Sequence, residues 1–154
     1  MKRKRFALHF ILHAADLLDD SLRHRLAVVG VRPRQARIID ALARMEPASQ
    51  IALAREFGIT PASMSTMTAR LIEAGHVMRE VNPNEARAHL LRLTESGRGL
   101  LAEIHAAWRD IDQLIEDTIG AQGAAELTEH TRALRDGLGG HAPGTARPEQ
   151  IADT

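Results

Sequence analysis

The spacing of apolar residues along the chain predicts a mostly helical protein. Over residues 6–28, apolar side chains recur every three or four positions, as on one side of a helix, and Gly30 ends the segment. The same period continues over residues 33–45, where Pro33 suits the first position of a second helix. The residues expected to face the core from these two helices are Leu8, Ile11, Ala15, Leu18, Leu22, Leu26, Ala36, Ile39, Leu42 and Ala43.

Two shorter helices follow, joined by a tight turn. Ser49 can cap a third helix over residues 49–57, and Gly58 can close it. Thr60 can cap a fourth helix over residues 61–74, because its hydroxyl can accept from a free backbone N–H of the first turn. The residues expected to be buried are Ile51, Ala54 and Phe57 in the third helix, and Met64, Met67, Thr68, Leu71 and Ile72 in the fourth.

After Gly75 the period changes from that of a helix to that of a strand. Alternating residues predict short strands at 76–81 and 89–93, and Asn82-Pro83-Asn84 between them is typical of a turn. Thr94 then suits the cap of a long helix. The remaining predicted segments are that helix over 95–120, a last helix over 123–138, and a tail rich in Gly and Pro over 139–154 that we expect to be disordered.

Three helices followed directly by a hairpin predict a winged helix–turn–helix over residues 32–94. The fold class is therefore mainly α with a small β-hairpin. An unrelated helical bundle with a surface hairpin is the alternative. The short turn at Gly58, and a hairpin that begins where the fourth helix ends, favour the winged helix.

The composition fits a single globular domain and excludes several kinds of chemistry. Of the 154 residues, 44% are hydrophobic and 26% are charged, which is ordinary for this class. No cysteine is present, so a disulfide scaffold, a thiolate zinc site and a cysteine redox switch are excluded. No apolar run reaches the roughly 20 residues that span a bilayer. We read the N-terminus as a helix with a basic leader rather than a signal peptide, and expect a cytoplasmic protein.

The charge is zero overall but unevenly distributed. Residues 1–31 hold 6 Lys and Arg against 3 acids, and residues 32–98 hold 10 arginines against 7 acids. Residues 99–154 hold only 4 arginines against 10 acids. The front of the chain is therefore basic and the back acidic. A surface that binds nucleic acid needs only local positive charge, so the balance permits a DNA-binding face on the predicted winged helix.

A specific combination of residues runs from the fourth helix to the start of the long one. Its members are Leu71, Gly75, Arg79, Pro83, Arg87 and the run LRLTESG. With this combination the chain resembles the MarR family of bacterial transcription regulators (multiple antibiotic resistance regulators) over residues 6–138.

The resemblance implies a homodimer that binds pseudo-palindromic double-stranded DNA. In the family, the first helix and the last two form the dimerisation region, here residues 6–30 and 95–138. Most members repress nearby genes and release DNA when a small ligand binds. The apolar sides of the first and long helices also exceed what a monomer of this size can hide, which favours a partner chain.

Two positions depart from the family pattern. The wing usually reads Asp-Pro-x-Asp-Arg-Arg, whereas here Ala86 stands in place of the first arginine and Arg87 matches the second. In the fourth helix, Thr66 stands where the family often has arginine. Both changes remove positive charge from the expected DNA face, so they bear on affinity and site preference.

The fourth helix is expected to read DNA with the side opposite its apolar residues. Small side chains on that side allow the helix to approach base edges in the major groove. Ser65 and Thr66 can hydrogen-bond bases, and the Thr66 methyl and Ala69 can contact a thymine methyl. Ser63 and Arg70 lie at the margin, where phosphates are the expected partners. A surface that merely tolerates small residues is the plain alternative.

The predicted wing adds two arginines to this face. Arg87, near the tip, is expected to enter the adjacent minor groove or to clamp a phosphate. Arg79, on the first strand, either contacts phosphate or pairs with Glu80 or Glu85. The predicted DNA-binding residues are thus Ser63, Ser65, Thr66, Ala69, Arg70, Arg79 and Arg87.

Histidines and aspartates form a stripe on the first helix. His9, His13, Asp16 and Asp20 are spaced by four, three and four residues, and these residue types can ligate a divalent metal. A solvated face, or polar contacts with a second subunit, are the plainer interpretations. We expect no metal site and no cofactor. A metal-responsive regulator remains the alternative that this stripe raises.

The family resemblance also implies a ligand pocket between the dimerisation region and the DNA-binding domain. Residues His13, Leu17, Arg37 and Trp108 are the candidates to line it, with Arg37 suited to an aromatic carboxylate. The most favoured function is a dimeric, ligand-responsive transcription regulator, a repressor rather than an activator. A protein–protein adaptor that has lost DNA binding is a rival. An enzyme is least favoured, since neither a phosphate-binding glycine loop nor a nucleophile–base set is found in the sequence.

Overall fold

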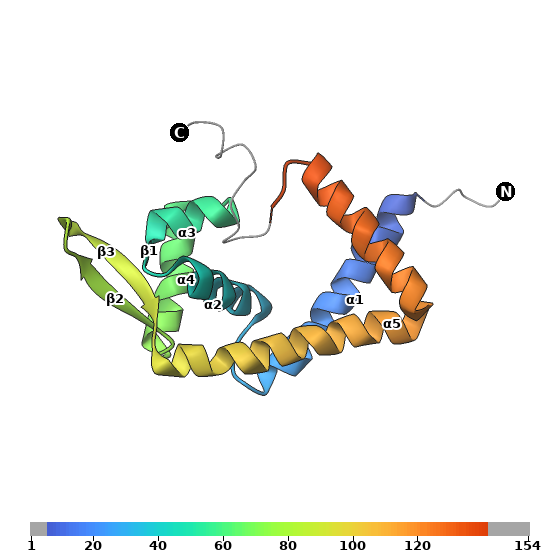
Figure 1. Cartoon of the computed structure of the whole chain (residues 1–154), viewed down its shortest axis with the longest axis horizontal. Coiled ribbons are helices and arrows are strands. Elements are labelled where there is room, and N and C mark those ends of the chain that lie inside the picture. The colour runs from blue at the N-terminus through green and yellow to red at the C-terminus, as the bar shows by residue number, and fades with distance from the viewer. Residues whose placement is uncertain (1–5, 142–154) are drawn as a thin grey trace.

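The structure is a computed structural model, and it describes residues 6–141 of the chain (Figure 1). The predicted basic leader, and the part of the predicted disordered tail after residue 141, lie outside the described residues. The elements are α1 (Ala7–Ala27), α2 (Pro33–Met45), β1 (Ala48–Ser49), α3 (Gln50–Phe57), α4 (Pro61–Glu73), β2 (Val77–Asn82), β3 (Glu85–Leu93) and α5 (Glu95–Gly137).

Local capping chemistry sets the starts of three helices. The Ser49 side chain accepts from the N–H of Ala52 at 3.1 Å, and the Thr60 side chain accepts from the N–H of Ser63 at 3.2 Å. Thr94 does the same for α5. Each hydroxyl satisfies a backbone donor that has no partner within the helix. The predicted winged helix–turn–helix is confirmed, with α3 and α4 as its helix pair and β2 and β3 as its wing (Figure 1).

The sheet has a third strand that the sequence pattern did not predict. The strand order is β1-β3-β2, all antiparallel, and β1 pairs Ala48 with Leu91 and Ser49 with Leu90. A strand of two residues has no readable period, so only its long-range pairing defines it. This pairing ties the start of α3 to the base of the wing.

The long helix bends once. Gly120 has φ 80° and ψ 160°, values far from those of a helix, and it divides α5 into two straight parts. The two predicted helices, 95–120 and 123–138, correspond to these parts. In Figure 1 the second part turns back across α1, and its end points toward the side of the molecule where α3 lies. α1 and α5 thus form a helical arm beside the winged domain.

One hydrophobic core joins the winged domain to the base of this arm. It draws residues from α1, α2, α3, α4, the sheet and the first part of α5. Its largest fully buried side chains are Leu26, Ile38, Ile39, Leu42, Leu53, Met64, Leu71, Leu91 and Ile104. α4 is therefore held by its inner side, with its outer side left free for a partner.

Burial differs from prediction at two places. In α3, Leu53 and Ala54 are buried, whereas Ile51 is 60% exposed, so its predicted burial is wrong. An eight-residue helix has too few turns for its apolar pattern to define one side. In α1, Leu8, Ile11 and Ala15 are exposed, contrary to prediction, because the N-terminal part of that helix extends beyond the core.

Within the described residues, no helix has both the length and the apolar content needed to cross a membrane.

Candidate nucleic-acid interface

α4 presents a small, polar side to solvent. Its inner residues Met64, Thr68 and Leu71 are buried, as predicted, because they pack into the core. The outer residues are all exposed, and they are Ala62, Ser63, Ser65, Thr66, Ala69 and Arg70. The exposure of these residues agrees with the prediction, and their contact with DNA stays a prediction.

Hydrogen bonds within α4 limit the donors and acceptors that its hydroxyl groups can present to DNA. Thr66 donates its single hydroxyl proton to the carbonyl of Ala62 at 3.2 Å. While that bond holds, the Thr66 oxygen can only accept, and its methyl group stays free. Thr66 is therefore suited to the amino group of adenine or cytosine rather than to a carbonyl oxygen. Thr60 likewise donates to the hydroxyl of Ser63 at 3.0 Å, which orients both side chains at the helix start.

An open groove lies between the two helices and the wing, with a volume of about 530 Å³. We call it the DNA groove. It is formed by the starts of α3 and α4 and by one face of the wing. The residues that line it are Ser49, Gln50, Ile51, Pro61, Ala62, Ser65, Arg79, Arg87, Ala88 and His89. The structure thus brings together three of the predicted DNA-binding residues, Ser65, Arg79 and Arg87, from three separate elements. Ser63, Thr66, Ala69 and Arg70 do not line this groove, although they are exposed on α4.

Strand pairing explains why both arginines face the groove. Arg79 on β2 pairs with Leu91 on β3, and Arg87 lies four residues before Leu91. Since side chains alternate along a strand, all three share one face of the sheet. Glu80 points to the other face, where Arg92 donates to it at 2.8 Å. Of the alternatives left open for Arg79, pairing with Glu80 is disfavoured, because Glu80 pairs with Arg92 on the other face.

Gln50, Ile51 and His89 are among the residues of the DNA groove that the sequence pattern did not assign to DNA binding. Gln50 and Ile51 begin α3, and His89 lies on β3. They meet because β1 pairs with β3 and carries the start of α3 to the wing. No pattern in the neighbouring sequence predicts this contact, because β1 has only two residues. A basic, partly apolar groove of this kind can take a phosphate backbone together with base edges.

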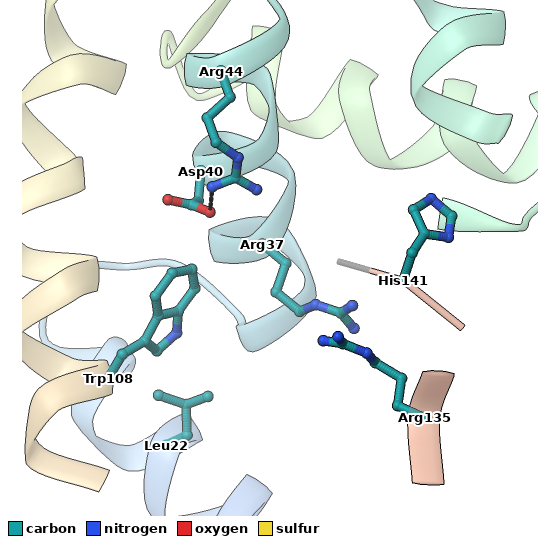
Figure 2. A pocket seen from close by; sticks show the side chains of 7 residues that line it. All are labelled: Leu22, Arg37, Asp40, Arg44, Trp108, Arg135 and His141. Atoms are coloured by element: carbon teal, nitrogen blue, oxygen red, sulfur yellow. Dashed lines mark hydrogen bonds and ion pairs between the residues drawn. The ribbon is translucent and has the colours of Figure 1, made fainter. Parts of the chain in front are cut away.

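A second cavity lies between the arm and the winged domain, with a volume of about 350 Å³ (Figure 2). Arg37 and Trp108, two of the four predicted pocket residues, line it. His13 and Leu17 do not line it, because they lie nearer the N-terminal end of α1 than Leu22 and are exposed there. We call this space the arm cavity. Its lining residues are Leu22, Arg37, Asp40, Arg44, Trp108, Arg135 and His141.

The arm cavity has more positive than negative charge. Asp40 is already engaged, by an ion pair with Arg44 and by His105, whose Nε2 lies 2.8 Å from the carboxylate. Figure 2 shows the guanidinium groups of Arg37 and Arg135 pointing toward each other from α2 and α5. Two like charges that converge in a cavity favour an anion between them. Trp108 adds an aromatic surface to the same cavity (Figure 2).

His141, the last described residue, lines the arm cavity. His141 contacts Glu56 of α3, with 3.1 Å between Nε2 and the carboxylate oxygen. Arg37 also lies over the ring of Phe57, 5.6 Å from its centre. Sequence reasoning missed Arg135 and His141 because each is about a hundred residues from Arg37 along the chain. Only the bend at Gly120 returns them to it.

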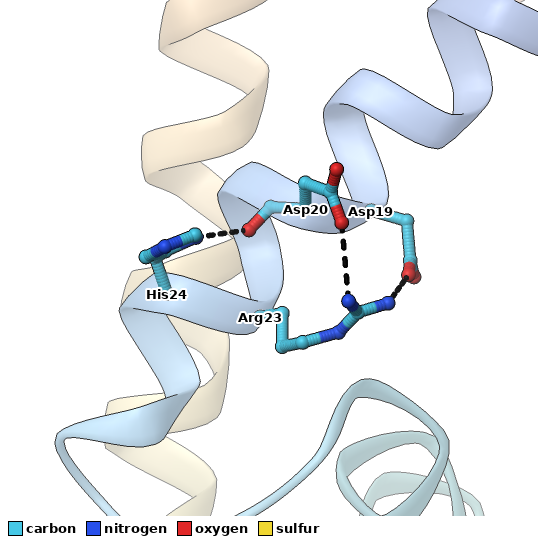
Figure 3. A network of polar contacts seen from close by, with 4 residues as sticks. All are labelled: Asp19, Asp20, Arg23 and His24. Atoms are coloured by element: carbon cyan, nitrogen blue, oxygen red, sulfur yellow. Dashed lines mark hydrogen bonds and ion pairs between the residues drawn. The ribbon is translucent and has the colours of Figure 1, made fainter.

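The histidine–aspartate stripe of α1 does not assemble into a metal site in the structure. Arg23 bridges Asp19 and Asp20 at 2.7 and 3.1 Å, and His24 donates through Nδ1 to the backbone oxygen of Asp20 (Figure 3). Across residues 6–141, no group of three or more His, Cys, Asp or Glu is placed to hold a metal ion. The physical reason is length, since a stripe from His9 to Asp20 extends about 16 Å along a helix.

The core, the exposed side of α4 and the DNA groove define a winged helix–turn–helix protein of the DNA-binding kind. Residues 29–88 match the sequence model of the MarR family. This match spans α2, the helix–turn–helix and the first part of the wing, and it indicates a DNA-binding transcription regulator rather than an enzyme. No curated protein matches the sequence.

Solved structures of the family share the fold. The reduced form of MarR from E. coli has 20% sequence identity and a TM-score of 0.76, over 86% of this chain and 98% of that one. A cysteine-to-serine mutant of the same protein, complexed with operator DNA, has 20% identity and a TM-score of 0.73, over 82% and 91%. The MarR family protein Rv2887 from Mycobacterium tuberculosis, in complex with DNA, has 21% identity and a TM-score of 0.71, over 85% and 98%.

Proposed function

We propose that this regulator is a dimeric, ligand-responsive repressor that binds a pseudo-palindromic operator from the cytoplasm. The observation that carries the proposal is the DNA groove, in which Ser65 of α4 and Arg79 and Arg87 of the wing line one surface. α4 would enter the major groove with its small side toward the base edges. The wing would place Arg87 on the adjacent backbone or minor groove, and Ser63 and Arg70 would contact phosphates.

Two copies of the chain would pair through the arm, with residues 6–30 and 95–138 as the dimerisation region and 32–94 as the DNA-binding domain. The support is the exposed apolar surface of the arm. Its large exposed side chains are Phe6, Leu8, Phe10, Ile11, Leu12, Leu17, Ile119, Leu127 and Leu134. Covering each by a partner contributes roughly 2 kcal/mol before the costs of association. This number of large exposed apolar side chains on one arm favours a partner that covers them.

The arm cavity is the proposed effector site. A carboxylate between Arg37 and Arg135 would satisfy both guanidinium groups, and an aromatic ring could rest on Trp108. These walls come from α2 and α5, so a ligand that binds them would fix the angle between arm and winged domain. An aromatic acid would thereby favour dimers whose two α4 helices no longer match major grooves about 34 Å apart.

The test is selection of bound sequences from random double-stranded DNA with the full chain, followed by titration of salicylate and benzoate into the complex. We expect an enriched palindrome and its release by one of the acids. An enriched palindrome that neither acid releases contradicts the effector class alone. Failure to enrich any palindrome contradicts the proposed repressor itself.

A further inference from the structure

Ile51 is a large apolar side chain that lines the DNA groove together with two arginines, Arg79 and Arg87. It is the second residue of α3 and is 60% exposed. Leu53 and Ala54 hold α3 to the core, which leaves Ile51 on the side of the DNA groove. Among the groove residues it is the largest aliphatic side chain. Packing does not explain an exposed isoleucine there, because residues 6–141 leave it 60% exposed.

The neighbours of Ile51 indicate what would cover it. Ala62 and Ser65, on the side of α4 expected to face base edges, line the same groove, and Arg79 and Arg87 supply its positive charge. Nearly all groups that a major groove presents are polar. The C5-methyl of thymine is the apolar one. An aliphatic side chain beside the base-reading helix therefore has one well-matched partner on a base edge.

We infer that Ile51 is a specificity residue that packs on a thymine methyl at the edge of each half-site. The inference rests on the proposed DNA-binding function and adds a base preference to it. Isoleucine suits this role because its branched side chain is stiff and loses little freedom when it is covered. Ser65 and Thr66 would then read polar groups of neighbouring bases. α3 would contribute to recognition directly rather than only supporting α4.

The expected effect follows from the size of one methyl group. Burying a methyl against aliphatic surface changes affinity by about fourfold for one half-site, and by about fifteenfold for both. Replacing thymine with deoxyuridine removes that methyl and leaves every hydrogen-bonding group in place. The substitution therefore isolates the apolar contact from the polar ones.

The experiment uses the operator selected from random DNA by the wild-type chain. Each thymine is replaced in turn by deoxyuridine, and affinity is measured for the wild type, Ile51→Ala and Ile51→Val. Met78→Ala is the matched control, since Met78 is 43% exposed on the other face of the wing and does not line the DNA groove. We expect one symmetric thymine pair at which deoxyuridine weakens the wild type and Met78→Ala, weakens Ile51→Val less, and leaves Ile51→Ala unchanged.

The possible failures are distinguishable. If the wild type enriches no sequence, the proposed DNA-binding function fails before Ile51 is tested. If an operator is found but deoxyuridine has no effect at any position, or the same effect in Ile51→Ala as in the wild type, the thymine contact is overturned. A uniform loss of affinity for all DNA in Ile51→Ala also overturns it, because it would place Ile51 on the sugar–phosphate backbone. The deoxyuridine series on the wild type needs no variant, so it remains decisive if Ile51→Ala folds poorly.

Discussion

Replacing Arg87 with alanine should lower the affinity for operator DNA and also flatten its dependence on salt. Arg79 and Arg87 are the arginines of the DNA groove, so a dimer brings four of them to the backbone. Each neutralised phosphate adds about −0.9 to the slope of log affinity against log salt, or roughly −3.6 for four contacts. Arg87→Ala removes two of these, which makes the slope shallower by about 1.8. Between about 50 and 200 mM salt, the wild type should then lose roughly twelvefold more affinity than the variant.

Fluorescence anisotropy of a labelled operator across a KCl series measures both slopes. Arg109→Ala is the matched control, because Arg109 is exposed on α5 and does not line the DNA groove, so its slope should equal that of the wild type. Arg87→Lys should keep the slope, since it keeps the charge, but should lose preference for a narrow minor groove. Parallel slopes for Arg87→Ala and the wild type would show that the wing does not touch phosphate.

Three further changes test the arm, the arm cavity and the packing of the wing. Phe10→Asp places a charge on the exposed apolar side of α1 and should weaken dimerisation by roughly a hundredfold; a dimer that persists in sedimentation velocity at low concentration would exclude this interface. Arg135→Ala should weaken calorimetric binding of whichever aromatic acid releases DNA by about tenfold, through loss of a charge-assisted hydrogen bond, and equal affinities would remove Arg135 from the site. Gly97→Ala should lower the free energy of unfolding by about 1–3 kcal/mol, because its Cβ would lie 2.1 Å from the backbone oxygen of His76. Gly99→Ala, which meets open space two residues later, should instead raise it by about 0.5–1 kcal/mol, and urea unfolding that ranks the pair the other way would contradict this packing.

Helix boundaries could be predicted because capping is local chemistry. Ser49, Thr60 and Thr94 each bond a backbone donor three residues away, so a reader of the sequence sees both partners at once. The change from helical to alternating spacing after Gly75 predicted the wing for the same reason, since it involves only residues close together in the sequence. The fourth helix was assigned its inner and outer sides correctly, since 13 residues contain enough turns to define an apolar side.

The composition of the two sites was less predictable. Ile51 was assigned to the core because the apolar pattern of an eight-residue helix fits two orientations, and only the packing of Leu53 chose between them. Arg135 and His141 line the arm cavity because the chain bends at Gly120. No neighbouring residue specifies the direction of this bend.

The sequence by itself determined the order of the helices and the two wing strands, their capped ends, and the small, nearly uncharged side of α4. Those features depend on residues within a few positions of each other. The tertiary structure decided which residues share a surface: β1 pairing brought Gln50 and Ile51 to the wing, and the fold of α5 returned Arg135 to Arg37. Such contacts depend on chain segments that are far apart in sequence, where periodicity and capping carry no information.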